Sequence, residues 1–408
     1  MTAPLHDQPV TYFRKGFGLK ADVQSELSAD YNGRVVDTLR EHDYTLVVDD
    51  VTIMLAREFG FCYGVERAVE YAYQAHRKFP DRRLLLVGEI IHNPHVNDKL
   101  RGMGIEIMTP GADGVFDFSR IGPEDVVILP AFGVTIAAFE ALRATGCVLV
   151  DTTCGSVLNV WKRVDVYARD GYTALIHGKY YHEETRATAS QVMKHPGGSY
   201  LIVRDMGEAR EVCDYIEGRG DRTAFLAKYG KAASPGFDPD VHLLRVGVAN
   251  QTTMLAKESL AIGEEVGLAM ARARGDAARA TDFRTFDTIC SATQERQDAV
   301  MALLEEPLDA MIVIGGFNSS NTISLAALCA ERVPTYHIED AEGIEPESGT
   351  VHYRVAGVKH VEETRAGWMP TGRPARIGVT AGASTPNNKI GETVGRILAT
   401  RGLVLATP

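Results

Sequence analysis

The sequence predicts an α/β protein of two to three domains, and three observations support this prediction. The chain has 408 residues, which at roughly 150 residues per domain is too long for one ordinary core. Short apolar runs alternate with segments of helical periodicity. In addition, three cysteines each stand at a predicted strand-to-helix turn, which suggests three similar α/β units that face one centre.

The predicted strands are short apolar runs without polar alternation. Each run leads into a loop rich in Gly, Ser, Thr, Asn, Cys or His, and a helical period follows. Such runs are typical of strands buried on both faces, as in parallel sheets. They lie at residues 84–87, 126–129, 148–150, 174–176, 243–248, 311–314 and 377–379. Ligands of open α/β sheets bind beyond the carboxyl ends of strands, so the loops after these runs are where we expect function.

Composition and charge exclude several classes of protein. The 43 Lys and Arg residues against 54 Asp and Glu give a net charge of −11, whose field repels nucleic acid and anionic membranes. The most apolar stretch, residues 126–139, is interrupted by Pro130 and Gly133 and is too short to span a bilayer. The chain does not open on a secretory signal, and its six cysteines do not resemble a disulfide framework. We therefore expect a cytoplasmic protein that binds neither nucleic acid nor membrane.

The order of segments along the chain contains a faint repeat. Residues 1–50 form a polar leader without clear chemistry. The tetrad Asp-Thr-Thr-Cys at 151–154 resembles Asp-Thr-Ile-Cys at 287–290, and each tetrad precedes a predicted helix. Gly60-Phe61-Cys62 opens a third helix in the same way.

Local sequence divides the six cysteines into two groups. Cys62, Cys154 and Cys290 stand at or just before predicted helix N-termini, where free N–H groups and the helix dipole favour a thiolate. The cysteines that lie inside predicted strands and helices, and are expected to be small buried hydrophobic residues, are Cys147, Cys213 and Cys329. A buried thiol and a metal ligand are both open for the first group. Soft thiolates select zinc or an iron–sulfur cluster, but without a Cys-x-x-Cys pair a zinc ribbon or a ferredoxin-type motif is absent.

Two loops have the composition of an anion site. Residues 315–321 (Gly-Gly-Phe-Asn-Ser-Ser-Asn) and 380–386 (Thr-Ala-Gly-Ala-Ser-Thr-Pro) each follow a predicted strand and enter a predicted helix. Small residues let the backbone approach a phosphate, and hydroxyl and N–H groups bind it. N-capping by Ser or Thr would explain either loop alone. The pair, together with a possible cysteine triad, favours phosphate or diphosphate, and the absence of Walker and Rossmann glycine motifs means that no nucleotide is implied.

Four polar residues outside these loops are further candidates. His92 is a possible partner of an anion, and His182 and Glu184 are possible proton carriers. Thr252 is a possible hydrogen-bonding group. Each also has an ordinary explanation, since loop histidines are often structural, surface glutamates are solvated and threonine is a common helix cap.

Together these segments resemble a known family, the 4-hydroxy-3-methylbut-2-enyl diphosphate reductases, the last enzymes of the non-mevalonate isoprenoid route. The resemblance covers about residues 52–395, and its motifs are specific as an ordered set. They are the segments 60–68, 92–93, 153–154, 182–184, 251–253, 290–293, 318–321 and 380–384. The leader and the extra length between Glu184 and Gln251 resemble the longer form of plants and cyanobacteria.

The resemblance implies three α/β domains in a pseudo-threefold arrangement around a central iron–sulfur cluster. An N-terminal extension at residues 1–50 would precede domains at 51–153, 154–289 and 290–408. One [4Fe–4S] cluster per chain would be held by Cys62, Cys154 and Cys290. The positions that would grip the diphosphate are His92, Ser319, Ser320, Asn321 and Ser384. The positions that would lie near the reacting hydroxyl and serve catalysis are Glu184, His182 and Thr252, of which His182 and Thr252 would also bind substrate.

The implied reaction is a two-electron, two-proton reductive dehydroxylation of (E)-4-hydroxy-3-methylbut-2-enyl diphosphate to isopentenyl and dimethylallyl diphosphates. Beside this allylic diphosphate, the expected partner is an electron donor of the ferredoxin or flavodoxin type, because the chain lacks a nicotinamide or flavin motif. Two positions depart from the family pattern. Phe132 stands where the short form has a second diphosphate-binding histidine, and Gly155 follows Cys154 where proline is more usual.

Two other classes of protein share part of this pattern. One is another three-cysteine enzyme with an open iron, such as a quinolinate-synthase-like enzyme. The paired phosphate-type loops and the His182 and Glu184 pair disfavour it. The other is a non-catalytic iron–sulfur sensor or zinc module, which would need the cysteines but not the polar set.

Overall fold

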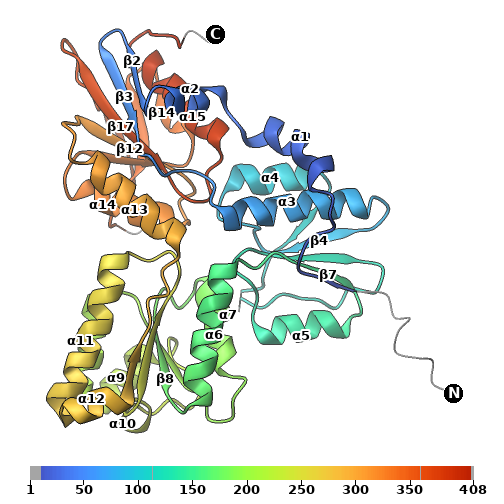
Figure 1. Ribbon diagram of the computed structural model, residues 1–408, viewed down its shortest axis with the longest axis vertical. Coiled ribbons are helices and arrows are strands. Elements are labelled where there is room, and N and C mark those ends of the chain that lie inside the picture. The colour runs from blue at the N-terminus through green and yellow to red at the C-terminus, as the bar shows by residue number, and fades with distance from the viewer. Residues whose placement is uncertain (1–10, 113, 359, 406–408) are drawn as a thin grey trace. The chain divides into compact units, whose positions relative to one another are not determined.

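Parallel strands form the centre of each of the three β-sheets found in the described residues (Figure 1). The computed structural model describes residues 11–112, 114–358 and 360–405. Contacts divide the chain into two compact units. The first unit comprises the described residues up to Gly16, Phe79–Gly88 and Gly104–Cys290, and the second comprises Phe17–Lys78, Glu89–Met103 and the described residues from Ser291 onward. The expected α/β class is confirmed.

The N-terminal sheet, in the first unit, has the order β1-β7-β6-β4-β5, and its strand pairs are all parallel. Its strands are β1 (Tyr12–Phe13), β4 (Leu84–Val87), β5 (Glu106–Met108), β6 (Val126–Leu129) and β7 (Val148–Asp151). β4, β6 and β7 are buried along their whole length, as their unbroken apolar runs predict. Helix α5 (Ile136–Ala144) connects β6 to β7, and the Thr135 hydroxyl caps it by accepting the N–H of Ala138 at 3.3 Å.

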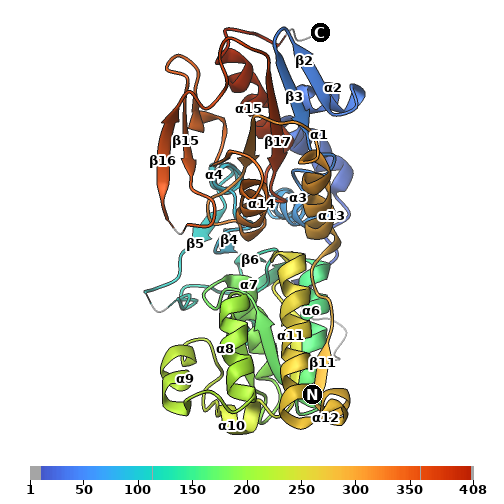
Figure 2. The ribbon, with the colours of Figure 1, turned by 90° about the vertical axis from the view of Figure 1, so that its left-hand side faces the viewer.

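The middle sheet, also in the first unit, is parallel with the order β11-β10-β8-β9. Its strands are β8 (Thr173–His177), β9 (Tyr200–Val203), β10 (Val246–Asn250) and β11 (Phe283–Thr285). The helices of this part of the chain are α6 (Gly155–Arg169), α7 (Glu183–Val192), α8 (Met206–Ile216), α9 (Arg222–Tyr229), α10 (Pro239–His242), α11 (Ala256–Arg274) and α12 (Asp276–Asp282). Helices α8 and α11 lie side by side (Figure 2).

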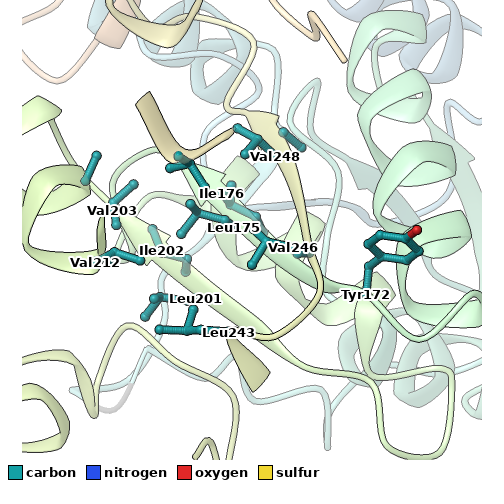
Figure 3. Close-up of a cluster of buried hydrophobic side chains, with 14 of the residues drawn as sticks. Tyr172, Leu175, Ile176, Leu201, Ile202, Val203, Val212, Leu243, Val246 and Val248 are labelled. Carbon is teal, nitrogen blue, oxygen red and sulfur yellow. The ribbon is translucent and has the colours of Figure 1, made fainter. Parts of the chain in front are cut away.

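A continuous apolar cluster holds the middle sheet to its helices. Leu175, Ile202 and Val248 lie in this cluster with Val212 of α8 (Figure 3). Burial of each such side chain stabilises the fold by about 1.5–3 kcal/mol. The strand expected at residues 243–248 begins only at Val246, because α10 occupies the preceding turn and Leu243 is its C-cap.

The C-terminal sheet, in the second unit, has eight strands in the order β14-β15-β13-β12-β17-β3-β2, with β16 paired to β15. They are β2 (Thr45–Val48), β3 (Val51–Leu55), β12 (Ala310–Ile314), β13 (Thr335–Ile338), β14 (Ile344–Glu345), β15 (Thr350–Arg354), β16 (Glu362–Ala366) and β17 (Ala375–Ala381). The inner strands are parallel, whereas β2 and the β14–β16 group are antiparallel. The helices of this unit are α1 (Lys20–Tyr31), α2 (Arg34–Glu41), α3 (Tyr63–Lys78), α4 (Pro94–Gly102), α13 (Ser291–Leu303), α14 (Ser320–Ala330) and α15 (Asn387–Ala399), with the 3₁₀ turn η1 (Ala341–Gly343).

Strand β3 lies early in the chain but belongs to the sheet formed mainly by the C-terminal residues. β3 pairs with β17, so that Ile53 lies opposite Ile377, and both side chains are fully buried. Residues 51–55, which we expected in the first domain at 51–153, therefore belong to the C-terminal sheet. The pairing of distant buried strands outweighs their separation along the chain.

The segment expected to be a polar leader is folded in its described part. β1 pairs with β7, and the hydroxyl of Tyr12 donates to Asp151 at 2.5 Å. In the second unit, Val36 and Leu39 of α2 are fully buried in the core of the C-terminal sheet. Residues 1–10 of the expected extension lie outside the described residues. Within the described part of the chain, none of the helices combines the length and the apolar composition needed to cross a membrane.

Candidate functional site

The structure separates the six cysteines as the sequence predicts. All six lie in the described part of the chain, and none of them forms a disulfide. Cys62, Cys154 and Cys290 are half-buried. The fully buried cysteines are Cys147, Cys213 and Cys329. Burial raises the pKa of Cys213 and of Cys329 to about 12, so these two thiols are poor sources of thiolate.

Cys62 stands at the N-terminus of α3 in the second unit. Its carbonyl oxygen accepts the N–H of Glu66 at 2.9 Å, which makes Cys62 the N-cap residue. Its own N–H donates to the carbonyl oxygen of Ala383 at 3.2 Å, and the N–H of Gly60 donates to Ala381 at 3.2 Å. Gly60 has a φ of +67°, a conformation that favours glycine. The cysteine turn and the loop after β17 therefore hold each other.

Cys154 is the N-cap residue of α6 in the first unit, and its side chain forms no capping hydrogen bond. Its N–H donates to the carbonyl oxygen of Ala131 at 2.9 Å. The carboxylate of Asp151 fixes the turn from the other side, because it accepts the N–H of Thr153 at 2.9 Å and its hydroxyl at 2.5 Å. The same carboxylate accepts the hydroxyl of Tyr12, so the start of the chain braces this cysteine turn.

Cys290 immediately precedes α13, and its N–H donates to the carbonyl oxygen of Thr252 at 3.3 Å. Thr252 belongs to the loop that follows β10. The third cysteine is thus connected to the polar loop of the middle sheet, also in the first unit.

A buried acid lies at the carboxyl end of the middle sheet. Glu184, in the first turn of α7, is 3% exposed. One carboxylate oxygen accepts the N–H of Thr252 at 2.7 Å, and the other accepts its hydroxyl at 3.0 Å. His182 caps α7, with Nδ1 accepting the N–H of Glu184 at 3.2 Å. A neutral imidazole that accepts at Nδ1 carries its proton on Nε2, so His182 is a donor at Nε2.

Phe132 packs against this acid group. Its ring lies 6.0 Å from the ring of His182, edge to face. Phe132 also follows Ala131, whose carbonyl oxygen holds Cys154. The residue that departs from the family pattern therefore forms an apolar contact beside the acid and a cysteine turn.

A second polar group lies in the second unit, where the loops after β12 and β17 meet the His92 segment. The Ser384 hydroxyl donates to the carbonyl oxygen of His92 at 3.1 Å and to Ser319 Oγ at 3.4 Å. Asn321 accepts the N–H of Ala383 at 2.8 Å. Gly316 is required by close approach, because a Cβ there would lie 2.6 Å from the His92 carbonyl oxygen. The structure thus brings the predicted diphosphate residues of this unit into one cluster.

Capping accounts for part of this cluster. Ser319 is the N-cap residue of α14 and accepts the N–H of Thr322 at 3.4 Å, while Ser320 and Asn321 begin the helix. His92, Ser319, Ser320, Asn321 and Ser384 are nevertheless all buried. Their hydrogen bonds to one another and to neighbouring backbone hold these polar groups in place beside the N-terminus of α14.

Two residues of this cluster, Glu89 and Asn318, were not among the predicted site residues. Glu89 accepts from His92 Nδ1 at 2.8 Å and from the side-chain amide of Asn318 at 3.2 Å. The carboxylate therefore orients the histidine ring and connects it to the loop after β12. The only sequence signal was the three-residue spacing between Glu89 and His92, which is too common to identify a site.

Each of the three half-buried cysteines offers a thiol that can hold a metal. These three thiols form no disulfide, and two of the cysteines that carry them are helix N-cap residues. The other three cysteines are buried. Thiolates at helix N-termini are stabilised by the helix dipole and are ligands of iron–sulfur clusters and zinc. A buried carboxyl group such as that of Glu184 can hold a proton, and hydroxyl groups such as those of Ser319 and Ser384 can donate to an anion.

Known proteins are similar to this chain over most of its length. The family model described as LytB protein matches residues 53–398. A 4-hydroxy-3-methylbut-2-enyl diphosphate reductase of Gloeobacter violaceus is 48% identical over 97% of this chain and 94% of its own length. The protein of the same name from Thermosynechococcus vestitus is 47% identical over 96% and 95%.

Solved structures are similar as well. One is of (E)-4-hydroxy-3-methyl-but-2-enyl diphosphate reductase, described as the terminal enzyme of the non-mevalonate pathway. It has a TM-score of 0.51 and 28% identity, covering 85% of this chain and 98% of that one. The E-1-hydroxy-2-methyl-but-2-enyl-4-diphosphate reductase of Plasmodium falciparum has a TM-score of 0.61 over 85% and 87%, and at 20% identity it supports the fold alone. The family match and the two close relatives show that the chain belongs to the LytB protein family.

Proposed function

We propose that the chain reduces (E)-4-hydroxy-3-methylbut-2-enyl diphosphate to isopentenyl and dimethylallyl diphosphates, the last step of the non-mevalonate isoprenoid route. The reaction breaks the allylic C–O bond, takes up two electrons and two protons, and releases water. The observation that carries this proposal is the buried Glu184 carboxyl group, held by Thr252 and His182, in a chain whose relatives share this enzyme's name. The same agreement disfavours the quinolinate-synthase-like alternative and the sensor.

The proposed cofactor is one [4Fe–4S] cluster per chain, with Cys62, Cys154 and Cys290 as its ligands. The half-buried thiols at turns before helices support this assignment. Such a cluster supplies electrons one at a time and, at an iron without a protein ligand, a Lewis acid for the hydroxyl group.

Glu184 is the proposed proton donor to the leaving hydroxyl group. A carboxyl group must keep a proton to act in this way, and a polyanionic substrate nearby favours the protonated form. Thr252 holds the carboxyl group in place through its N–H and hydroxyl. His182, with its donor at Nε2, is proposed to bind the polar end of the substrate.

The proposed diphosphate ligands are His92, Ser319, Ser320, Asn321 and Ser384. Hydroxyl, amide and backbone N–H groups at the start of α14 are suitable donors for phosphate oxygens. Glu89 would keep the His92 ring aligned for this contact. The electron donor is proposed to be a small carrier of the ferredoxin or flavodoxin type, and the cytoplasm is the proposed compartment.

Anaerobic turnover tests the function directly. The purified chain, supplied with the hydroxybutenyl diphosphate and a reduced dye, is expected to form both five-carbon diphosphates, which chromatography separates and quantifies. Iron-loaded protein that forms neither product would contradict the proposal. Pyrophosphate binding without turnover would favour a sensor.

The His92→Ala variant is expected to weaken substrate binding at least about tenfold, or about 1.4 kcal/mol. Phe132 cannot donate to phosphate, so the histidine carries a larger share of diphosphate recognition. The measurement is a dissociation constant from anaerobic titration. His95→Ala is the matched control, because His95 stands three residues away in α4 and packs its ring against Tyr31.

The Phe132→Ala variant is expected to lower turnover and shorten the lifetime of the cluster in air, with only a modest loss of affinity. The reason is the loss of the apolar contact beside His182, which would let water reach the acid group. Cluster absorbance after exposure to air measures the lifetime. Normal binding by His92→Ala together with abolished binding by Phe132→Ala would reverse the assignment of the diphosphate end.

A further inference from the structure

Arg296, in α13, is a buried guanidinium group whose hydrogen bonds all go to backbone carbonyl groups. The residue is 3% exposed. Its Nε and Nη2 atoms lie 3.2 and 2.7 Å from the carbonyl oxygen of Gly60, and Nη2 also lies 3.4 Å from that of Phe59. Nη1 donates to the carbonyl oxygen of Ala292 at 2.8 Å. The side chain therefore connects α13 to the turn that precedes α3, both within the second unit.

This charge lacks the acidic partner that buried arginines normally have. Among the described residues, no carboxylate forms an ion pair with Arg296, although other arginines of the same unit have one. Burial raises the pKa of Glu66, and the positive charge of Arg296 opposes this as a smaller effect. Burial of a charge without a balancing partner is strongly unfavourable. A negative group that balances the guanidinium is therefore expected nearby.

The position of the guanidinium identifies that group. Gly60 precedes Cys62 by two residues, and their N–H groups donate to the last residue of β17 and to the loop after it. Arg296 binds the carbonyl side of the same turn. The turn of the first cysteine is thus held on one side by backbone and on the other by a cation. In addition, α13 begins directly after Cys290, so Arg296 stands on the helix of the third cysteine.

We propose that Arg296 is a positioning residue for the metal centre, which fixes the Cys62 turn and supplies the positive charge that balances the thiolate-bound cluster. The inference rests on the proposed function, because the balancing negative charge is that of the thiolates and their iron–sulfur group. Residues around a metal centre that orient its ligands typically alter metal affinity 10–100-fold when they are changed. Positive charge near a cluster also favours its reduced form.

The test compares Arg296→Gln with Arg296→Lys in the full-length chain. Arg296→Gln removes the charge, and we expect iron release to a chelator to be at least about tenfold faster and the midpoint potential to be more negative. Arg296→Lys keeps the charge but loses the planar set of donors. Its potential is therefore expected to stay near that of the parent chain, with iron release between the two.

Arg401→Gln is the matched control. Arg401 also binds backbone carbonyl groups of the second unit, those of Pro370 and Arg373, but it is paired with Asp50 at 2.7 Å. Its replacement is expected to lower thermal stability equally with and without the cluster, and to leave the potential unchanged. Arg296→Gln is expected to destabilise the loaded chain much more than the iron-free chain. In the iron-free chain the substitution also removes a buried charge that has nothing to balance it, which offsets part of the loss.

The inference would be overturned if Arg296→Gln released iron at the rate of the parent chain and had the same midpoint potential. An equal loss of stability in the loaded and iron-free forms would also overturn it, because it would mean that Arg296 is merely structural. A parent chain that binds no iron–sulfur cluster would contradict the proposed cofactor, and the inference with it.

Discussion

The Glu184→Gln variant is expected to bind iron and substrate like the parent chain and to turn over at least about 100-fold more slowly. Glutamine has nearly the shape of glutamate but cannot donate an acidic proton. Its carbonyl oxygen can accept the N–H of Thr252, as the carboxylate does at 2.7 Å, and its amide can donate to the threonine hydroxyl. The substitution therefore removes the acid while it keeps the contacts.

Single-turnover product formation under anaerobic conditions, with reduced dye in excess, measures this effect because electron supply is then not limiting. Glu183→Gln is the matched control. Glu183 is the adjacent residue of α7 and carries the same functional group, but its side chain is exposed, whereas that of Glu184 is buried against Thr252. Its substitution is expected to leave turnover within about twofold of the parent chain, since substitutions at exposed positions usually change the folded structure little. Near-parental turnover in Glu184→Gln would remove this carboxyl group from proton delivery.

The predicted strands and cysteine groups were accessible from the sequence because their signals are local. Unbroken apolar runs identified β4, β6 and β12, and the helical period after each cysteine identified the turns. The polar candidates share a local signal too, since Ser319 and Ser384 stand in loops that follow buried strands. The structure then brings them within hydrogen-bonding distance.

Long-range pairing was not accessible in this way. The pairing of β3 with β17 joins segments more than 300 residues apart, and neither strand carries a mark of its partner. The sequence around Glu89 and Arg296 does not distinguish them from ordinary charged surface residues. Only the structure shows that Glu89 binds the His92 ring and that Arg296 is buried. The folding of the described part of the N-terminal segment was not accessible for the same reason, because the contact of Tyr12 with Asp151 is set by the fold and not by composition.

Cys154→Ser is expected to abolish stable cluster binding, whereas the parent chain is expected to carry about four irons and four sulfides after anaerobic preparation. A serine hydroxyl ionises far less readily than a thiol and is a harder ligand, so it is a poor substitute for a thiolate on iron. Serine is, however, a preferred N-cap residue, and the backbone N–H of residue 154 can still donate to Ala131. Helix α6 is therefore expected to form normally, so that the loss of iron reports the missing ligand.

Cys213→Ala provides the comparison that gives this result its meaning. Cys213 is 2% exposed in the core of the middle sheet, so its replacement removes a buried sulfur and is expected to lower the unfolding temperature while iron and sulfide content stay at the parental level. Cys154→Ser is expected to show the opposite pattern, with little change in the stability of the iron-free chain and no retained cluster. Iron and sulfide assays on both variants, beside thermal unfolding of their iron-free forms, separate a ligand from a core residue. Zinc as the sole stoichiometric metal of the parent chain would contradict the proposed iron–sulfur centre. A full cluster in Cys154→Ser would contradict the role of Cys154 as a ligand, because no other group of that turn is proposed to hold an iron.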